Sequence, residues 1–203
     1  MPHLIAKKIQ MSQIFGEDGA VMPVTVLRVL PNIVTFVKTK EKDGYESVQI
    51  GFGERKTKNI KKPQAGHLKA SGASPMILRE FKTGEVMQVG DKIDASVFSE
   101  GDNVTASGIV KGRGFQGVVK RHGFHGGPRT HGQKHSEREP GSIGSVWPQR
   151  VLKGKRMAGR MGGNKITLKN LKIVKIDAAD NLIYVKGALP GGRGSLIEIK
   201  SAK

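Results

Sequence analysis

The sequence contains no cysteine and few aromatic residues. Its 203 residues include one Trp, two Tyr and seven Phe. The absence of cysteine excludes disulfide bonds and thiolate metal sites, and it agrees with a reducing compartment. The N-terminal segment lacks the apolar run of a secretory signal, and no stretch stays apolar for long enough to cross a membrane. We therefore expect a soluble, cytoplasmic protein with no membrane partner.

Acidic residues are also scarce, and unevenly so. The chain has 17 Asp and Glu against 35 Lys and Arg, a net charge of +18. Residues 111–163 alone hold 12 Lys and Arg, 2 acids, 4 His and 13 Gly, which is a net charge of +10. Such a segment cannot bury enough apolar surface to offset its ordering entropy, so it needs an anionic partner. Nucleic acid is the anionic partner that fits best. Binding to an anionic membrane usually requires an amphipathic basic helix, and Gly and Pro interrupt this basic segment too often for such a helix.

The remaining residues have the pattern of β-strands. Apolar and β-branched residues recur in short segments, with Asp-Gly turn signals at 18–19 and 43–44, as is typical of an antiparallel meander. Pro23 inside one segment indicates an edge strand or an irregularity. The predicted strands cover residues 6–15, 21–29, 33–37, 45–52, 76–81, 86–89, 93–98, 104–110, 165–177, 182–186 and 196–200.

Strands on both sides of the basic segment imply that it leaves the sheet system and returns to it. We predict a mostly β fold, with a small closed β-barrel of residues 1–110 and 164–203 and a long irregular extension of residues 111–163. Closure removes exposed sheet edges, and about 150 residues suffice for a hydrophobic core. Residues 54–75 predict an inserted loop with one short helix. Its basic run, 55–62, is either a solvated surface or an auxiliary RNA contact.

One pattern in the extension resembles a dinucleotide-binding site. Residues 112–117 read Gly-Arg-Gly-Phe-Gln-Gly and satisfy the GxGxxG spacing. That fold also needs a helix beginning within the motif, and the residues that follow are poor helix formers soon interrupted by Gly and Pro. Glycines that let the main chain approach a phosphate backbone closely are the better interpretation.

The four histidines of the extension could be metal ligands. However, six Lys and Arg between Lys111 and Lys134 would repel a dication, and no thiolate is available. Imidazoles among Arg and Gly fit better as groups that stack on bases or bond to phosphates and 2′-hydroxyls. The adjacent pair His135 and Ser136 lacks an acid placed to orient it. We predict no enzyme activity, no metal, no cofactor and no small-molecule substrate.

Trp147 is the only tryptophan, and it stands among Gly and Pro residues. It is either a core aromatic of the barrel or an exposed ring that stacks on a base, and the turn-like surroundings favour the second interpretation. Cations can bind phosphates, and aromatic or imidazole rings can stack on bases. The RNA interface predicted on these grounds comprises Lys111, Arg113, Phe115, Lys120, Arg121, His122, His125, Arg129, His131, Lys134, His135, Arg138, Trp147, Arg150, Lys153, Lys155, Arg156 and Arg160.

Long motifs in the chain resemble the family of the third ribosomal protein of the large subunit, in its bacterial form. They comprise residues 7–15, 111–121, 126–132, 138–144, 153–159 and 185–191. The resemblance implies a translation-protein β-barrel near the 3′ end of large-subunit ribosomal RNA, with an extension reaching toward the peptidyl transferase centre. It also implies early binding in subunit assembly, no catalytic residue, and the fourteenth and nineteenth ribosomal proteins of the large subunit as neighbours.

The tip of the extension departs from the bacterial pattern. Residues 146–150, Val-Trp-Pro-Gln-Arg, form a turn one residue shorter than the usual Thr-Pro-Gly-Arg-like one. The tryptophan is similar to that of the archaeal and eukaryotic tip, displaced by one position. Gln149 does not align with the glutamine that some bacterial members methylate, so methylation is not implied. Val110 also stands where a Ser or Thr is common.

Two other classes of protein remain as alternatives. An enzyme acting on RNA or nucleotides would need convergent acids or a nucleophile with its base, and the extension offers only Glu137 and Glu139. A DNA-binding protein would be expected to carry a helix-turn-helix or a basic helix, and the Gly-rich extension suits an irregular RNA surface better.

Overall fold

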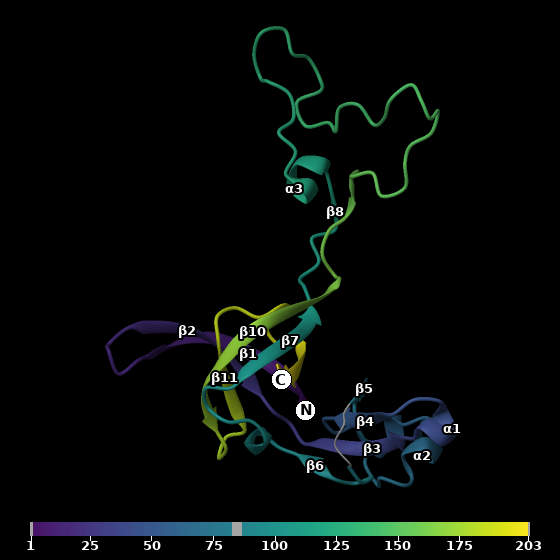
Figure 1. Cartoon of the computed structure of the whole chain (residues 1–203), viewed down its shortest axis with the longest axis vertical. Helices are drawn as coiled ribbons and strands as arrows, with labels where there is room; N and C mark the ends of the chain where they lie inside the picture. The colour runs from purple at the N-terminus through teal and green to yellow at the C-terminus, as the bar shows by residue number, and fades with distance from the viewer. Residues whose placement is uncertain (1, 83–86, 203) are drawn as a thin grey trace. The chain divides into compact units, whose positions relative to one another are not determined.

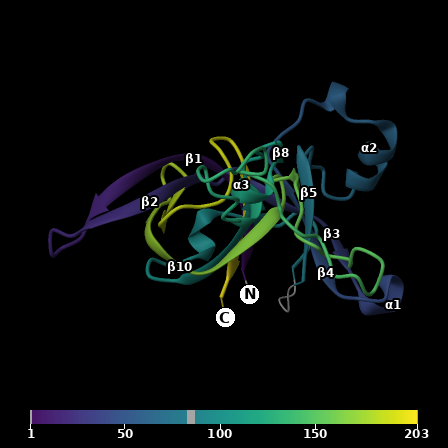
Figure 2. The same cartoon turned by 90° about the horizontal axis from the view of Figure 1, so that it is seen from above.

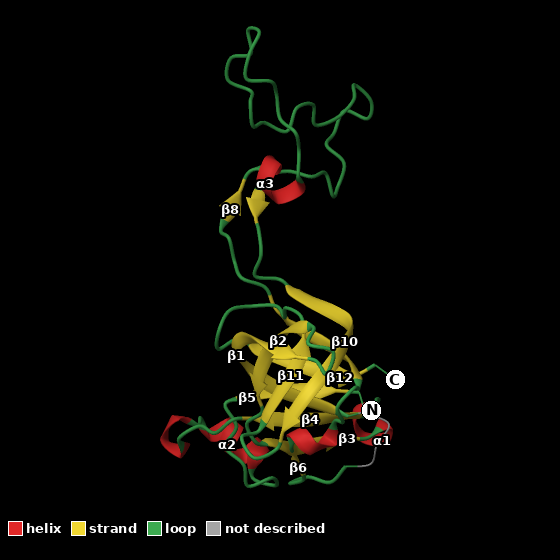
Figure 3. Cartoon of the chain, turned by 90° about the vertical axis from the view of Figure 1, so that its left-hand side faces the viewer, coloured by secondary structure: helices red, strands yellow, loops and turns green. Residues whose placement is uncertain are grey.

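The computed structural model describes residues 2–82 and 87–202. The chain divides into two compact units, of which the first comprises Met1–Ile109 and Lys165–Lys203 and the second Val110–Asn164. The first unit contains nearly all of the regular secondary structure, whereas most of the second is irregular loop, drawn green in Figure 3. No helix in the described ranges is long and apolar enough to span a membrane.

Six antiparallel strands of the first unit close into a barrel, which confirms the predicted mostly β fold with a closed barrel (Figure 1). The order around the barrel joins the first strand of the chain to the last, so closure depends on pairs far apart in sequence. The β1–β2 hairpin projects away from the barrel, and its two strands stay paired as far as Phe15 and Val21 (Figure 2). In barrel order the strands are β1 (His3–Phe15), β12 (Leu196–Ser201), β7 (Asn103–Ile109), β10 (Lys165–Asp177), β11 (Leu182–Lys186) and β2 (Val21–Arg28).

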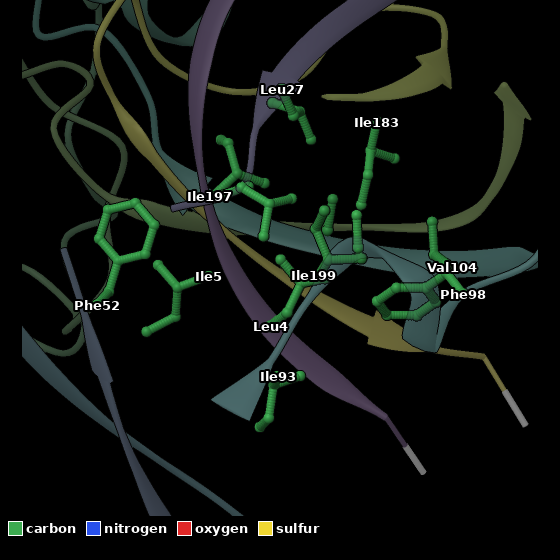
Figure 4. Packing of buried hydrophobic residues seen from close by; sticks show 14 of the residues in the cluster. Leu4, Ile5, Leu27, Phe52, Ile93, Phe98, Val104, Ile183, Ile197 and Ile199 are labelled. Atoms are coloured by element: carbon green, nitrogen blue, oxygen red, sulfur yellow. The ribbon is translucent and has the colours of Figure 1, made fainter. Parts of the chain in front are cut away.

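Alternating apolar residues fill the barrel. In β7, Val104 and Ala106 are fully buried while Thr105 between them is not, as expected where successive side chains point to opposite faces of a sheet. Ile183 on β11 and Ile197 and Ile199 on β12 are also fully buried (Figure 4). The period-two pattern of the sequence therefore corresponds to the inner face of the barrel.

A second sheet packs against the same hydrophobic core, and the sequence pattern did not predict it as separate. It consists, in spatial order, of β5 (Ile77–Phe81), β4 (Ser47–Phe52), β3 (Asn32–Lys38) and β6 (Lys92–Ile93). Val34, Ile50 and Phe52 of this sheet belong to the cluster that contains the barrel residues. Pro31 lies in the short connection between the end of β2 at Arg28 and the start of β3. It has no N–H to donate, so it cannot continue the hydrogen bonding of a strand there.

Several local predictions were wrong. The predicted strand 93–98 is strand only at its first residue, and residues 95–97 form the 3₁₀-helix η2 (Ala95–Val97). The predicted strand 86–89 contains no strand over 87–89, and Val86 lies outside the described residues. The turn at 43–44 is the end of a short helix, α1 (Lys40–Asp43), which Gly44 terminates with a φ of 80°.

The segment 54–75 contains two short helices, η1 (Thr57–Asn59) and α2 (Lys62–Leu68). Leu68 is buried, and the ring of His67 lies 5.5 Å from the ring of Phe36 on β3. His67 Nε2 is 2.7 Å from Oε1 of Gln49 on β4. These contacts hold α2 on the four-stranded sheet.

Candidate nucleic-acid interface

The two chains that begin and end the second unit are joined as a stem, defined here as residues 110–117 and 157–164. The Val110 N–H donates to the Asn164 carbonyl at 3.0 Å, and the Arg113 N–H donates to the Met161 carbonyl at 2.8 Å. Two short strands, β8 (Phe115–Gln116) and β9 (Gly159–Arg160), continue the pairing. Gly162 has a φ of 75°, and a Cβ on it would lie 2.2 Å from the carbonyl oxygen of Lys111. The close approach of the two chains therefore requires glycine at this position.

A one-turn helix, α3 (Val118–His122), follows the first chain of the stem. Its buried Val118 anchors it, and Gly123 ends it in the left-handed conformation. Arg121 Nη1 donates to the carbonyl of Met157 at 2.7 Å, and His122 Nε2 donates to the same oxygen at 3.0 Å. Arg121 and His122 therefore hold α3 to the second chain of the stem.

The helix α3 was not predicted, but it does not create a dinucleotide site. The dinucleotide-binding unit places a helix between two parallel strands. Here β8 is two residues long and pairs antiparallel with β9. The exposed residues 112–115 belong to the first chain of the stem.

A loop beyond α3 is closed by one backbone pair and one ion pair. The Gly127 N–H donates to the Glu137 carbonyl at 2.9 Å, and Arg129 Nε lies 3.1 Å from Glu137 Oε2. A Cβ on Gly126 would lie 2.0 Å from the same carbonyl oxygen, so the crossing of the two chains needs glycine there. An open hollow of about 670 Å³ lies beside this loop, lined by His122, Phe124, His125, Glu139 and Arg156 among others.

The tip of the second unit, defined here as residues 140–156, has only local hydrogen bonds. Its hydrogen bonds within the described chain span at most three residues, as in the bond from Ser142 Oγ to the Gly144 carbonyl. Trp147 is 75% exposed and precedes a cis peptide bond to Pro148. Trp147 is therefore no core residue of the barrel, which excludes one of the two interpretations of this residue.

Most cations of the second unit have no intramolecular partner. Two of the twelve have one: Arg121 bonds to the Met157 carbonyl, and Arg129 pairs with Glu137. The other ten are exposed, and none makes a side-chain hydrogen bond or ion pair within the described residues. They are Lys111, Arg113, Lys120, Lys134, Arg138, Arg150, Lys153, Lys155, Arg156 and Arg160.

The predicted rings of the interface differ in exposure. Phe115 on β8 is 76% exposed, and His125, His131 and His135 are also exposed. His122 is half-buried against Met157. Within residues 2–82 and 87–202, no group of three or more His, Asp or Glu side chains is arranged to hold a metal ion.

Four apolar residues of the tip were not predicted as part of the interface. Ile143, Val146, Val151 and Leu152 are all exposed, Val146 by 76%. Apolar residues without a strand or helix period, next to a cationic run, are the sequence signal that could have indicated them. The tip therefore presents apolar side chains beside the cations that follow it.

A second basic surface lies on the first unit, around α2. Arg55, Lys56, Lys58, Lys61 and Lys62 are exposed, and their side chains have no partner among the described residues. The contacts of α2 with the four-stranded sheet hold this surface in place. A solvated surface and an auxiliary RNA contact both remain compatible with this arrangement.

Comparison with known proteins agrees with these features. A family model described as Ribosomal protein L3 matches residues 52–182. The large ribosomal subunit protein uL3 of Streptococcus pyogenes serotype M1 is 50% identical over 200 residues, which cover 98% of this chain and 96% of the relative. The uL3 protein of Geobacillus thermodenitrificans is 48% identical over 202 residues, covering 98% and 95%. This chain therefore belongs to the ribosomal protein L3 family.

Proposed function

We propose that this chain binds large-subunit ribosomal RNA directly and that the second unit supplies the principal contact surface. Membership in the family makes the chain a structural protein of the large ribosomal subunit in the cytoplasm, with ribosomal RNA and other ribosomal proteins as partners. The family is structural, so the chain is not an enzyme. In functional terms the proposed division is a barrel domain of residues 1–110 and 164–203 and an RNA-binding extension of residues 111–163.

The observation that carries the proposal is the set of ten exposed cations without an intramolecular partner. Glu137 and Glu139 are the only acids of this unit, so ion pairs within the unit cannot neutralise most of its cations. Repulsion among the cations opposes a compact free state, and a polyanion removes that repulsion. Neutralising phosphates also releases counterions, which is the main favourable contribution to such binding.

The predicted interface residues fall into two groups. The ten free cations are proposed to bind phosphates, whereas Phe115, Trp147, His125, His131 and His135 are proposed to contact bases or 2′-hydroxyls. The other three predicted residues have partners within the chain: Arg121 and His122 are bonded to the Met157 carbonyl at the stem, and Arg129 pairs with Glu137. Their outer edges can still contact RNA once the stem is formed.

Four finer statements, on assembly, the tip, the barrel domain and the neighbours, extend the proposal. The protein binds early in subunit assembly, because a surface of this charge is best neutralised before later proteins cover the RNA. The tip reaches toward the peptidyl transferase centre, and the barrel domain lies near the 3′ end of the large-subunit RNA. The proposed protein neighbours are the fourteenth and nineteenth ribosomal proteins of the large subunit.

A direct binding experiment tests the main proposal. The full chain is titrated onto large-subunit ribosomal RNA transcribed in vitro, with small-subunit ribosomal RNA and duplex DNA as competitors at the same salt concentration. We expect preferential binding to the large-subunit RNA. Equal affinity for the large-subunit RNA and for the two competitors would contradict the proposal, because charge alone would then explain the binding.

The reach of the tip can be tested separately. The chain has no cysteine, so Gln149→Cys introduces a unique attachment site for an iron chelate that cleaves nearby RNA. Asp18→Cys, in an exposed turn of the first unit, is the matched control. In assembled subunits we expect cleavage around the peptidyl transferase centre from position 149 and elsewhere from position 18. Cleavage confined to other RNA regions from position 149 would refute the placement of the tip.

A further inference from the structure

The thirteen glycines of the second unit are not equivalent. Eight have a positive φ, between 68° and 81°, a conformation that other residues rarely adopt. The main-chain path of the free protein accounts for glycine at these eight positions. They are Gly114, Gly123, Gly126, Gly132, Gly141, Gly154, Gly162 and Gly163.

Packing within the chain disfavours a side chain at two more glycines. A Cβ on Gly127 would lie 2.7 Å from Gln133 Nε2, and a Cβ on Gly159 would lie 2.6 Å from Arg121 Nη1. Separations below 3.0 Å force one of the two groups to move. The Arg121 guanidinium is held by the Met157 carbonyl, so a side chain at position 159 would disturb the stem.

Three glycines have no such reason within the chain. Gly112, Gly117 and Gly144 lie outside the left-handed region, and a Cβ on any of them would meet no atom within 4 Å. Gly117 has φ −68° and ψ 167°, which any residue can adopt. Glycine loses more conformational entropy on folding than other residues do, so alanine would favour the folded free chain at these positions.

The main-chain N–H groups of the same three glycines are available as donors. All three residues are exposed, and none of the three N–H groups donates to an acceptor within the described chain. Lys111 and Arg113, both free cations, flank Gly112, and the exposed ring of Phe115 lies between Gly112 and Gly117 in sequence. Trp147 follows Gly144 by three residues. Each of these glycines therefore lies close in sequence to residues proposed to bind RNA.

We propose that Gly112, Gly117 and Gly144 are contact points at which the sugar–phosphate backbone of RNA lies directly against the protein main chain. The RNA occupies the space that a Cβ would fill, and the free N–H groups donate to phosphate oxygens. The partner, not the fold of the free chain, thus accounts for glycine at these positions. This inference rests on the proposed RNA-binding function and assigns residues within that interface.

The test replaces each of the three glycines with alanine in the full chain and measures binding to large-subunit ribosomal RNA transcribed in vitro. Inserting a methyl group into a close contact is expected to weaken binding by about tenfold for each variant. No charge is removed, so the dependence of affinity on salt concentration is expected to stay as in the wild type. Gly16→Ala in the first unit is the control, because its N–H is already bonded to the Ala20 carbonyl and its Cβ would have only an ordinary contact.

Gly117 needs one additional variant, because it is the residue that precedes α3 and alanine is a poor helix cap. Gly117→Ser adds a larger side chain but improves the cap. Weaker binding by Gly117→Ser supports the contact, whereas wild-type binding by this variant would show that capping explains the alanine result and would overturn the assignment of Gly117.

The outcomes separate this inference from the proposed function. If the wild type does not bind the RNA, the proposed function is wrong. If the wild type binds and the three alanine variants bind equally well, only the glycine contacts are refuted. A changed tryptic pattern in a free alanine variant would overturn the assignment at that position, because the free chain would then need the glycine. A changed salt dependence would likewise overturn it, since displaced cations would then explain the loss.

Discussion

At the scale of single residues, the structure excludes Trp147 from the core of the barrel and leaves base stacking as its predicted role. Its ring is 75% exposed on a tip with only local hydrogen bonds. Stacking of an aromatic ring on a base contributes about 1–3 kcal/mol by the alanine measure. This free energy is small beside the contribution expected from the cations that we propose to bind phosphates, so loss of the ring should affect the local site more than overall binding.

We therefore expect Trp147→Ala to assemble into large subunits normally while altering translation or sensitivity to drugs of the peptidyl transferase centre. Sucrose-gradient profiles and antibiotic susceptibility of cells carrying the variant measure both effects. Trp147→Phe, which keeps a stacking ring, is the control and should restore most of the wild-type behaviour. A block in assembly, or a loss of stability in the free barrel, would contradict this role.

Glu80 on β5 illustrates a residue that links strands through charge. Its carboxylate accepts a hydrogen bond from Ser47 Oγ at 2.6 Å and lies 2.9 Å from Lys38 Nζ. Hydrogen bonds from Ser47, Lys38 and Tyr45, in decreasing order of effect, lower the pKa of Glu80 to about 2. Tyr45 and Glu80 together raise the pKa of Lys38.

A lowered pKa has a definite consequence for stability against pH. The contribution of the Glu80 charge is fully present above the pKa of an unfolded Glu, about 4.3, and is lost as pH falls toward 2. We expect Glu80→Gln to lower the free energy of unfolding by about 0.5–1 kcal/mol at pH 7. The difference from wild type should shrink at pH 3, as measured by urea unfolding. Glu46→Gln, at an exposed carboxylate, should show no such pH-dependent difference.

At the scale of elements, the buried side chain of Asn32 joins the two sheets of the first unit. Its Oδ1 accepts from the Ile5 N–H at 3.0 Å, and its Nδ2 donates to the carbonyls of Ile5 and Leu30 at 3.0 and 2.9 Å. The residue is fully buried at the start of β3. Its amide takes the place of a neighbouring strand beside Ile5 of β1.

Asn32→Leu should therefore cost about 2–4 kcal/mol, since it leaves two buried main-chain groups of Ile5 without partners. The midpoint and slope of urea unfolding measure this loss. Asn103→Leu, at an exposed asparagine of β7, should stay within about 0.5 kcal/mol of wild type. A small effect at position 32 would mean that the two sheets do not depend on this side chain.

The tip should be the first element of the free protein to be cleaved by trypsin. Residues 140–156 make only local hydrogen bonds, and Arg150, Lys153, Lys155 and Arg156 are exposed in this region. The cations of β10 are exposed too, but β10 is a barrel strand, paired with β7 over its first part and with β11 over its last part. We expect the earliest cuts after residues 150–156, detected by mass spectrometry, and protection of these sites in assembled subunits. Early cleavage within β10 would contradict the expectation.

At the scale of the whole molecule, the binding of RNA should depend steeply on salt. If half of the ten free cations of the second unit bind phosphates, the log–log slope of affinity against salt concentration is about −3.5 to −4.5. Arg121 and Arg129 do not enter this number, because both have partners within the chain. Filter binding at several salt concentrations measures the slope.

Two matched sets of charge reversals locate the contact surface. In the first set Lys111, Arg113, Lys120, Lys155 and Arg156 are changed to Glu, and we expect the slope to lose more than half of its magnitude. In the second set Arg55, Lys56, Lys58, Lys61 and Lys62 are changed to Glu, and we expect a smaller change of the slope. The opposite ranking would assign the principal RNA contact to the surface around α2.

The sequence alone determined the features that depend on composition and local period. Period-two alternation predicted most barrel strands, because side chains on successive strand residues face opposite sides whatever their partners are. The concentration of charge and glycine in residues 111–163 is likewise a property of the residues themselves. The failures at 93–98 and 43–44 are short segments in which strand, turn and 3₁₀-helix have similar local preferences.

Only the tertiary structure decided which strands pair and which cations are free. Closure of the barrel joins β1 to β12, and hydrogen bonds from Asn32 to Ile5 join the separate sheet to the barrel. Both are contacts between residues far apart in the chain. Arg121 and Lys120 are adjacent and carry the same charge, yet one holds the Met157 carbonyl and the other faces solvent. A sequence determines which residues carry charge, whereas the return path of the chain determines where each charge finds a partner, because that path brings the acceptor within reach.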